Sequence, residues 1–223
     1  MPISSRREPA DDGLFIVGLV GQAGSGKSTA ARALERDGAV VIDADTLGHD
    51  IVIDDPDVRT ALIAEYGADI YGPQGLDRRR VAAVVFQDAA ARERLNRLMH
   101  PRIVDRMMAR LRELRRQGFR GVVVVDAALL LDWGFEYECD AVMAVLAPRD
   151  AQLERLRAQR DWSAEEAARV LEVQRPPAAL AAAADVTLDN QGLPEDLERA
   201  AREAILRLRA GFPDRKGHDA SSC

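Results

Sequence analysis

One nine-residue segment, GQAGSGKST at Gly21–Thr29, constrains the fold of this chain more than any other. It follows the apolar run LFIVGLV and leads into KSTAARALERDG, which has helical spacing and stops at a glycine. Gly21-x-x-x-x-Gly26-Lys27-Ser28 satisfies the P-loop pattern in the strand–loop–helix context that this pattern requires. The segment therefore predicts a phosphate-binding loop between a buried strand and a helix.

The residue types of this loop suit the oxygens of a nucleotide's phosphates. Glycines let backbone N–H groups converge on a phosphate, and the N-terminus of the following helix adds its positive end. Lys27 is one of only two lysines among 31 basic residues, so the position favours a compact ammonium over a forked guanidinium. Ser28 would give its hydroxyl to Mg²⁺. The predicted nucleotide-binding residues of the loop are Gly21, Gln22, Ala23, Gly24, Ser25, Gly26, Lys27, Ser28 and Thr29.

Composition excludes several classes of protein. The chain has 223 residues, enough for one α/β domain with insertions or for a domain with a small subdomain. Its apolar runs are strand-sized, so we expect no membrane partner. A net charge of −6 argues against a nonspecific nucleic-acid binder, and two cysteines offer no disulfide framework. We therefore expect a cytoplasmic protein.

Strand-like and helical segments alternate along the rest of the chain. AVVID, VVVVDAALLL, DAVMAVLA and DVTLDN read as strands that alternate with helices, and most carry apolar runs, which predict a mostly parallel sheet covered on both faces. The segment YGPQGLD predicts a hairpin or turn, and Ser163 with Glu166 predicts a capping box. A helical zone from about Asp88 to Arg116 contains Pro101, which predicts an end or a kink there.

A P-loop names a nucleotide and leaves the reaction open. Asp45-Thr46-Leu47-Gly48 matches the D-x-x-G loop of GTPases, but the chain lacks the N/T-K-x-D motif that reads guanine. The G-x-G-x-x-G spacing of dinucleotide-binding proteins is also absent. The residues around the loop thus predict neither guanine specificity nor a dinucleotide.

Three aspartates follow predicted strands. Asp45 lies where a ligand crevice is expected in a doubly wound sheet, and an aspartate there also suits a helix N-cap. Asp43 either supports a metal site without binding the ion directly or caps a helix. Asp126 ends the run VVVVD, where a water-mediated contact to Mg²⁺ would compensate its burial, and a simple turn is the alternative.

Several stretches together resemble the dephospho-CoA kinase family. In the family's order they are IVGLVGQAGSGKSTAARALERDGAVVIDAD, GLDRRRVAAVVF, RLNRLMHPRIV, VVVVDAALLL, RLRAQRDWSAEEAARVLEVQ and ADVTLDNQG, within about Phe15 to Gly211. The family usually has Gly-Ile where Gln22-Ala23 stand, Ala-Arg where Gly48-His49 stand, and Val-Pro in place of Ala127-Ala128. The P-loop atoms that bind phosphate are unaffected, since they belong to the backbone, Lys27 and Ser28.

The resemblance implies an α/β P-loop nucleoside triphosphate hydrolase fold. It would have a five-stranded parallel sheet with helices on both faces, a helical substrate-binding insertion and a helical lid. We expect a disordered extension over residues 1–13, a kinase domain over 14–211 and a flexible tail over 212–223. The insertion would lie at about 55–117 and the lid at about 149–183. The implied reaction transfers the γ-phosphoryl group of ATP to the ribose 3′-hydroxyl of dephospho-CoA, with Mg²⁺, in a monomer or weak homo-oligomer.

The resemblance also suggests roles for particular residues. Asp45 would accept the proton of the attacking hydroxyl, and Arg160 of the lid would stabilise the transferred charge beside Lys27. His100 with Arg78 and Arg102 would bind the substrate, although a histidine cap and solvated arginines are the plainer readings. Asn190 would contact adenine, or form a simple turn.

Two other functions fit parts of the sequence. Another small-metabolite or nucleotide kinase of the same fold would have the same loop, and only the insertion and the LMHP segment would distinguish it. A P-loop ATPase that acts as a conformational switch on a protein partner would hydrolyse ATP slowly without a small acceptor. The sequence disfavours the switch, because no arm, repeat or interaction helix stands out beyond the core.

Overall fold

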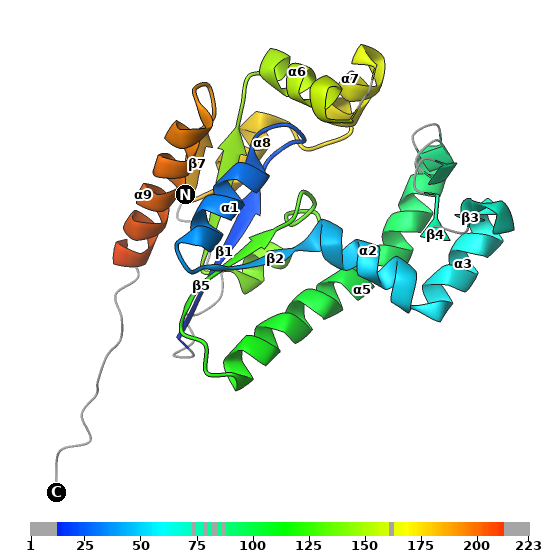
Figure 1. Cartoon of the computed structure of the whole chain (residues 1–223), viewed down its shortest axis with the longest axis horizontal. Helices are drawn as coiled ribbons and strands as arrows, with labels where there is room; N and C mark the ends of the chain where they lie inside the picture. Colours follow the sequence, from blue (N-terminus) through cyan, green and yellow to red (C-terminus); the bar gives the residue numbers. More distant parts are fainter. Residues whose placement is uncertain are drawn as a thin grey trace, which may run out of the picture. The chain divides into compact units, whose positions relative to one another are not determined.

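A computed structural model describes residues 13–211 except 73–74, 78–79, 82–83, 86–87 and 161–162; of residues 159–160 it describes only the backbone. The chain divides into two compact units (Figure 1), one built from the segments up to Ile42 and from Gly118 onward, the other from Asp43–Gln117. The expected lid falls in the first unit, and the expected insertion falls within the second. The expected extension, except Gly13, and the expected tail lie outside the described residues.

The first unit is organised around a five-stranded sheet. Its strands are β1 (Leu14–Val20), β2 (Val40–Asp43), β5 (Gly121–Asp126), β6 (Ala141–Leu146) and β7 (Val186–Asp189), in the order β2-β5-β1-β6-β7. β1 pairs in parallel with β5 and β6, and β6 pairs in parallel with β7. Ile16, Val17, Leu19 and Val20 are all buried, as a central strand covered on both faces requires. The predicted parallel sheet is confirmed.

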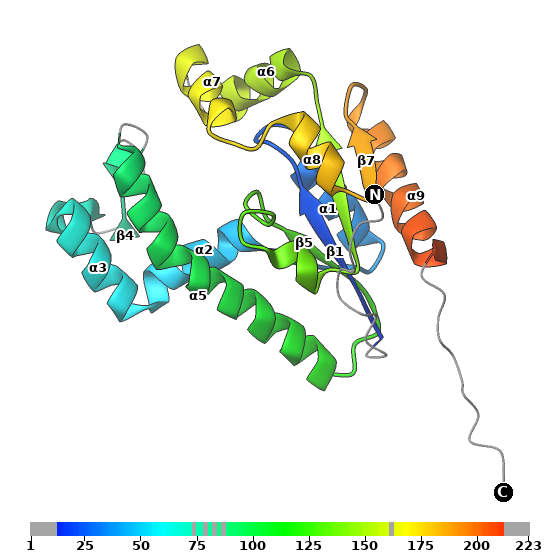
Figure 2. The same ribbon diagram turned by 180° about the vertical axis from the view of Figure 1, so that it is seen from behind.

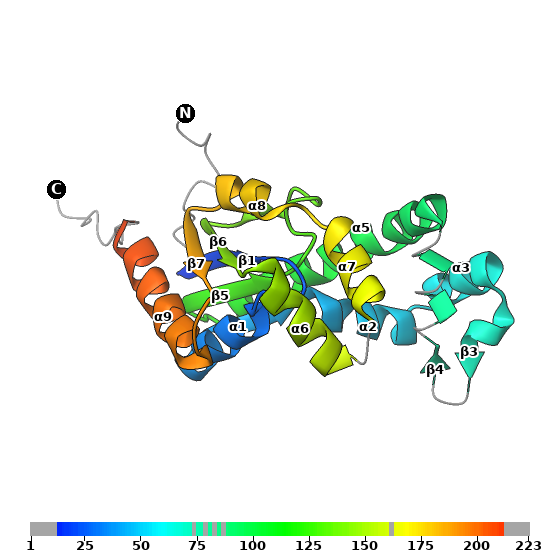
Figure 3. The same cartoon turned by 90° about the horizontal axis from the view of Figure 1, so that it is seen from above.

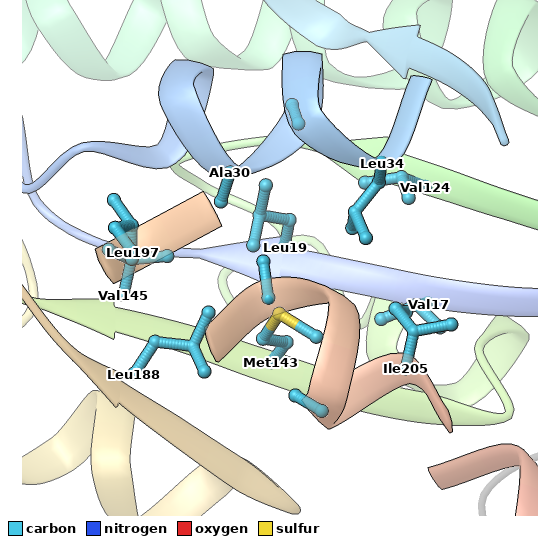
Figure 4. Packing of buried hydrophobic residues seen from close by; sticks show 13 residues of the cluster. Val17, Leu19, Ala30, Leu34, Val124, Met143, Val145, Leu188, Leu197 and Ile205 are labelled. Carbon is cyan, nitrogen blue, oxygen red and sulfur yellow. The ribbon is translucent and has the colours of Figure 1, made fainter. Parts of the chain in front are cut away.

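Helices cover both faces of this sheet (Figures 2 and 3). α1 (Lys27–Arg36) and α9 (Pro194–Gly211) lie on one face, and α8 (Pro177–Ala183) packs on β6 from the other. Figure 4 shows the core under α1 and α9, where Ala30 and Leu34 meet strand residues such as Leu19. The small alanines on the buried face of α1 let this helix approach the sheet closely, which places its N-terminus at the end of β1.

In the segment expected to form a lid, at about residues 149–183, two helices precede α8. They are α6 (Arg149–Arg160) and α7 (Ala164–Glu172), and a short 3₁₀ turn, η2 (Phe135–Glu138), precedes β6. The Ser163 hydroxyl accepts from the Glu166 N–H at 3.1 Å, while the Glu166 carboxylate accepts from the Ser163 N–H at 2.8 Å. This confirms the predicted capping box.

The second unit is mostly helical. It contains α2 (Ala44–Asp54), α3 (Pro56–Tyr66), the 3₁₀ turn η1 (Ala68–Ile70), β3 (Tyr71–Gly72), β4 (Gly75–Leu76) and α5 (Ala89–Arg116). β3 and β4 pair antiparallel, which confirms the hairpin. Each long helix begins after an aspartate whose carboxylate accepts backbone N–H groups of the first turn; these caps are Asp43, Asp55 and Asp88.

Of the two outcomes predicted for Pro101, the helix end is wrong, and the kink stays a prediction. α5 passes through Pro101 without interruption. The guanidinium of Arg102 donates to the Leu98 carbonyl at 2.9 Å, so a carbonyl beside the proline gains a donor. Beyond the proline, Ile103 and Met107 are buried, and this burial offsets the local cost of proline in a helix.

Across the described ranges, no helix combines the length and the apolar composition needed to cross a bilayer.

Candidate active site

The predicted phosphate-binding loop lies between β1 and α1. The residue before α1 is Gly26, whose φ of 107° is left-handed, and no side chain caps the helix there. Backbone N–H groups at this helix start are therefore available to an anion. Residues Gly21–Gly26 thus connect the carboxyl end of β1 to the start of α1.

Two glycines of the loop are required by their surroundings. At Gly26 a Cβ atom would collide with the amide nitrogen of Asn190. At Gly24, where φ is 73°, it would lie 2.9 Å from the Gln152 carbonyl oxygen. The loop is therefore enclosed by residues from α6 and from the end of β7, and no larger residue fits either position.

Lys27 reaches back across the loop. Its Nζ donates to the carbonyl oxygen of Gly21 at 3.1 Å, and the side chain is half-buried. Ser28, the next residue, is exposed in the first turn of α1. The ammonium and the hydroxyl thus lie at the same helix start as the loop amides, which is the arrangement that a phosphate group requires.

Asp126 lies on the strand adjacent to the one that leads into the loop. In the parallel register of β5 with β1 it is opposite Leu19, and the next N–H, of Ala127, donates to the Leu19 carbonyl at 3.3 Å. Its carboxylate is half-buried at the carboxyl end of the sheet, where the sequence placed it. Carboxylate and hydroxyl oxygens are donors that Mg²⁺ accepts.

The two aspartates after β2 have different environments. Asp43 caps α2: its Oδ1 accepts the N–H of Asp45 at 2.8 Å and that of Thr46 at 3.3 Å, and its Oδ2 accepts the Thr46 hydroxyl at 3.1 Å. The alternative that Asp45 is the N-cap is therefore wrong, and Asp43 is the cap. Asp45 lies in the first turn of α2 in the second unit with its side chain exposed.

Asn190 supports the loop from the end of β7. It is 6% exposed; its Nδ2 donates to the Ser25 carbonyl at 2.7 Å, and its backbone N–H donates to Leu146 O at 2.7 Å. Asn190 thus joins the last strand to the phosphate-binding loop, a contact that local sequence did not suggest. Asn190 directly follows the last residue of β7, Asp189.

The lid provides contacts that sequence reasoning missed. The Nε2 of Gln152 donates to the Ala23 carbonyl at 3.1 Å, and the Ala23 N–H donates to the Gln174 Oε1 at 2.8 Å. The guanidinium of Arg155 donates to the Gly24 carbonyl at 3.0 Å. Gln152 is 2% exposed. A signal was present, because glutamines stand out in lid helices otherwise rich in Arg, Glu and Ala.

The remaining predicted residues are only partly described. Arg78 and the side chain of Arg160 lie outside the described residues, although the backbone of Arg160 ends α6. His100 is half-buried on α5. Arg102 is engaged with Asp55, whose carboxylate accepts from the guanidinium Nε at 3.2 Å. Hydrogen bonds from the backbone N–H groups of Val58 and Asp57, and then from Arg102, hold the pKa of Asp55 below its ordinary value, although partial burial acts in the opposite direction.

Comparisons with known proteins point to one kinase family. The family model for dephospho-CoA kinase matches residues 15–196. A dephospho-CoA kinase of Geobacter sulfurreducens is 42% identical over 84% of this chain and 95% of its own length. One of Moorella thermoacetica is 37% identical over 92% and 98%.

Solved structures have the same fold. A crystal structure of a Thermus thermophilus protein is 30% identical and covers 87% of this chain and 97% of its own, with a TM-score of 0.72. A dephospho-CoA kinase of Campylobacter jejuni, 18% identical, covers 87% and 97% with a TM-score of 0.57 and supports the fold.

The matches extend over the phosphate-binding loop, the second unit and the lid. This chain therefore belongs to the dephospho-CoA kinase family, the ATP-dependent kinases of coenzyme A synthesis.

Proposed function

We propose that this chain carries out its family's reaction with Mg²⁺, transferring the γ-phosphoryl group of ATP to the ribose 3′-hydroxyl of dephospho-CoA. Membership of the family supports the reaction and both substrates. The structural observation that carries the proposal is Lys27, whose Nζ lies on the Gly21 carbonyl across an uncapped helix start. A compact cation and free N–H groups at one place are suited to the phosphates of a nucleotide.

The loop has the features of a phosphate cradle. The Ser25 hydroxyl is buried and has no hydrogen-bond partner in the part of the chain that the structure describes. A Cβ at Gly21 would lie 2.6 Å from this hydroxyl oxygen, so the glycine leaves the space open. A buried polar atom of this kind needs an acceptor or donor from a ligand or from water. A phosphate oxygen would satisfy it.

Ser28 and Asp126 fit a magnesium site. Both offer hard oxygen atoms and both lie in the first unit, Ser28 in the first turn of α1 and Asp126 at the end of β5. Mg²⁺ usually takes one or two protein ligands and fills its remaining positions with phosphate oxygens and water. When bound, the ion would neutralise charge on the phosphate oxygens. Ser28 and Asp126 would be the residues that hold it.

Asp45 would orient the acceptor hydroxyl and receive its proton. Its carboxylate is exposed and leaves the capping of α2 to Asp43, so it is available to a substrate. Phosphoryl transfer asks little covalent chemistry of the protein, and the effect of such a base is mainly to position the hydroxyl. Lys27 and Arg160 would stabilise the charge on the group in transfer.

The substrate would contact His100, Arg78 and Arg102. Arg102 would release its ion pair with Asp55 and bind a pyrophosphate oxygen instead. The side chains of both residues are about a third exposed, so this exchange is open to a ligand. Asn190 would belong to the nucleotide site. Its amide nitrogen donates to the Ser25 carbonyl of the loop, and the side chain would also contact the adenine ring. We also propose that the chain acts in the cytoplasm as a monomer or weak homo-oligomer, without nucleic acid.

The test is the release of ADP from ATP and Mg²⁺ with and without dephospho-CoA, alongside AMP, pantetheine, gluconate and shikimate. Stimulation by dephospho-CoA alone, with a 3′-phosphorylated product identified by mass spectrometry, is the expected result. Stimulation by another acceptor would overturn the substrate and favour a different small-molecule kinase. Slow hydrolysis without any stimulation would favour the ATPase switch.

A further inference from the structure

Gln22 connects the apex of the phosphate-binding loop to the end of a lid helix. Its carboxamide Nε2 donates to the Leu171 carbonyl at 3.3 Å and to the Arg175 carbonyl at 3.1 Å. The side chain is 8% exposed. Leu171 lies in the last turn of α7, which ends at Glu172. Carbonyls in a last helical turn have no partner within the helix, so the Gln22 amide satisfies groups that would otherwise be orphaned.

The two loop residues after Gln22 are held by the same lid. Ala23 is bonded through its N–H to Gln174 and through its carbonyl to Gln152, and Gly24 is bonded through its carbonyl to Arg155. The methyl group of Ala23 also packs against the apolar cluster of Leu156, Ala167 and Leu171. Every residue from Gln22 to Gly24 therefore has a polar partner in the lid.

The Arg175 end of this connection is itself anchored. Its guanidinium Nε donates to Asp132 at 2.7 Å, and Nη2 donates to the Leu131 carbonyl at 3.2 Å. Both partners lie in the segment after β5, the strand that ends at Asp126. A continuous path of hydrogen bonds thus runs from Gln22 through Arg175 to the segment that follows the proposed magnesium ligand.

We infer that Gln22 is a positioning residue that sets the loop apex in its phosphate-binding shape before ATP arrives. The inference rests on the proposed function, because it concerns how this site takes ATP. Ordering the backbone of one residue costs about 1–2 kcal/mol, and a loop that is already ordered avoids this cost on binding. The lid helices supply that order through Gln22, at a position where the family usually has glycine.

This role predicts a particular kinetic signature. Order in the loop benefits bound ATP and the transition state equally, so its loss raises the KM for ATP and leaves kcat unchanged. Delivery of a lid arginine to the γ-phosphoryl group would instead appear in kcat. A role in folding alone would lower thermal stability and leave the KM for ATP as it is.

The first experiment compares Gln22→Met with Gln117→Met in the full chain. Methionine keeps the length of the side chain and removes its donors. Gln117 is an exposed glutamine whose amide also donates, to Glu113, so it is the matched control. We expect Gln22→Met to raise the KM for ATP about 5- to 30-fold, since two bonds are lost and two carbonyls are orphaned. The kcat and the KM for dephospho-CoA should stay within about twofold of wild type, and Gln117→Met should match wild type throughout.

A readout independent of turnover accompanies the kinetics. Hydrogen exchange at the loop apex and the end of α7 should be faster in Gln22→Met than in wild type without ATP, and saturating ATP should narrow the difference. Gln22→Asn, which keeps a polar amide but withdraws it by one methylene, serves if the methionine variant does not fold. It should also raise the KM for ATP selectively.

Other outcomes would overturn the inference. An unchanged KM for ATP in a folded variant, or a loss confined to kcat, would show that Gln22 does not pre-order the loop. A wild-type enzyme that fails to phosphorylate dephospho-CoA would count against the proposed function instead. In that case the hydrogen-exchange rates of Gln22→Met and wild type, compared with and without ATP, would still test the inference.

Discussion

The phosphate-binding loop and the helices of the second unit are held by opposite means. Polar contacts to residues Gln22–Ser25 come from partners 129 to 165 positions away in the chain, on α6, on α7 and its following link, and after β7. The caps of α2, α3 and α5 instead bind N–H groups two or three positions away. The loop is thus a product of tertiary structure, whereas the start of each helix in the second unit is a product of local sequence.

The loop contacts and the helix caps also differ in burial. Gln22, Gln152 and Asn190 are nearly inaccessible, and each donates from a neutral amide. Asp43, the cap of α2, is an exposed carboxylate, and the proposed base, Asp45, follows it. Changes at the loop should therefore alter nucleotide binding at any pH, whereas changes at the caps should respond to acid.

Lys27→Ala provides the largest expected effect and tests the loop side of the comparison. Removing the ammonium should lower kcat/KM by about 10³-fold, because no neighbouring group can replace a compact cation on the phosphates. The melting temperature should hardly change, since the half-buried side chain contributes one bond to Gly21 O. Steady-state kinetics and thermal unfolding are the measurements. A collapse in stability would make Lys27 a structural residue.

Asp45→Asn tests the functional residue of the second unit. We expect kcat to fall about 10²-fold or more, since the amide cannot accept the proton of the attacking hydroxyl. The affinity for ATP should change far less, because ATP is assigned to the loop. Asp43→Asn is the matched control: asparagine retains the cap, so kcat should stay near wild type. Equal losses of kcat and ATP affinity at Asp45 would contradict its role as base and favour one in folding or metal binding.

Asn190→Ala tests whether Asn190 acts by supporting the loop or by contacting adenine. The variant orphans the Ser25 carbonyl, so the free energy of unfolding should fall by about 1–3 kcal/mol. The KM values for ATP and GTP should rise by the same factor if the residue acts through the loop. A rise for ATP alone would instead favour direct contact with adenine. Chemical denaturation and kinetics with both nucleotides distinguish these outcomes.

The smallest expected effect is on the acid stability that the helix caps Asp55 and Asp88 provide. Hydrogen bonds, first from Val58 N–H, lower the pKa of Asp55 below 3.8, and those from Ala91 and Ala90 lower the pKa of Asp88 likewise. Because both pKa values are depressed in the folded state, this stability is present above pH 3.8 and is lost as the pH falls through the folded values. The double variant Asp55→Asn/Asp88→Asn keeps both caps without titration, so its acid midpoint should move to lower pH.

Circular dichroism at 222 nm over an acid titration measures that midpoint. An exposed glutamate in an i,i+4 pair, Glu203 with Arg207, provides the control as Glu203→Gln. Should the double variant titrate like wild type, the caps would contribute nothing to acid stability, and the contrast between the two regions would weaken.

Sequence reasoning identified the parts of the site that depend on short-range patterns. The glycine spacing, Lys27 and the apolar run before them determined the loop, because few other residues permit such a backbone beside a helix start. Ser163 with Glu166 determined a capping box by the same local logic. The helix end expected as one of two outcomes at Pro101 is wrong, because burial of the second half of α5 outweighs the local penalty of proline.

Sequence alone therefore determined the sheet, the loop and the identity of its cation. Tertiary structure decided what holds the loop: Gln22, Gln152, Gln174 and Asn190 are ordinary polar residues by local criteria, and the side chain of each bonds a group 129 to 165 positions away in the chain. The physical reason is that a buried amide must find a partner wherever the fold brings one, and that partner is set by packing rather than by spacing. It is the fold that brings the lid to the apex of the loop.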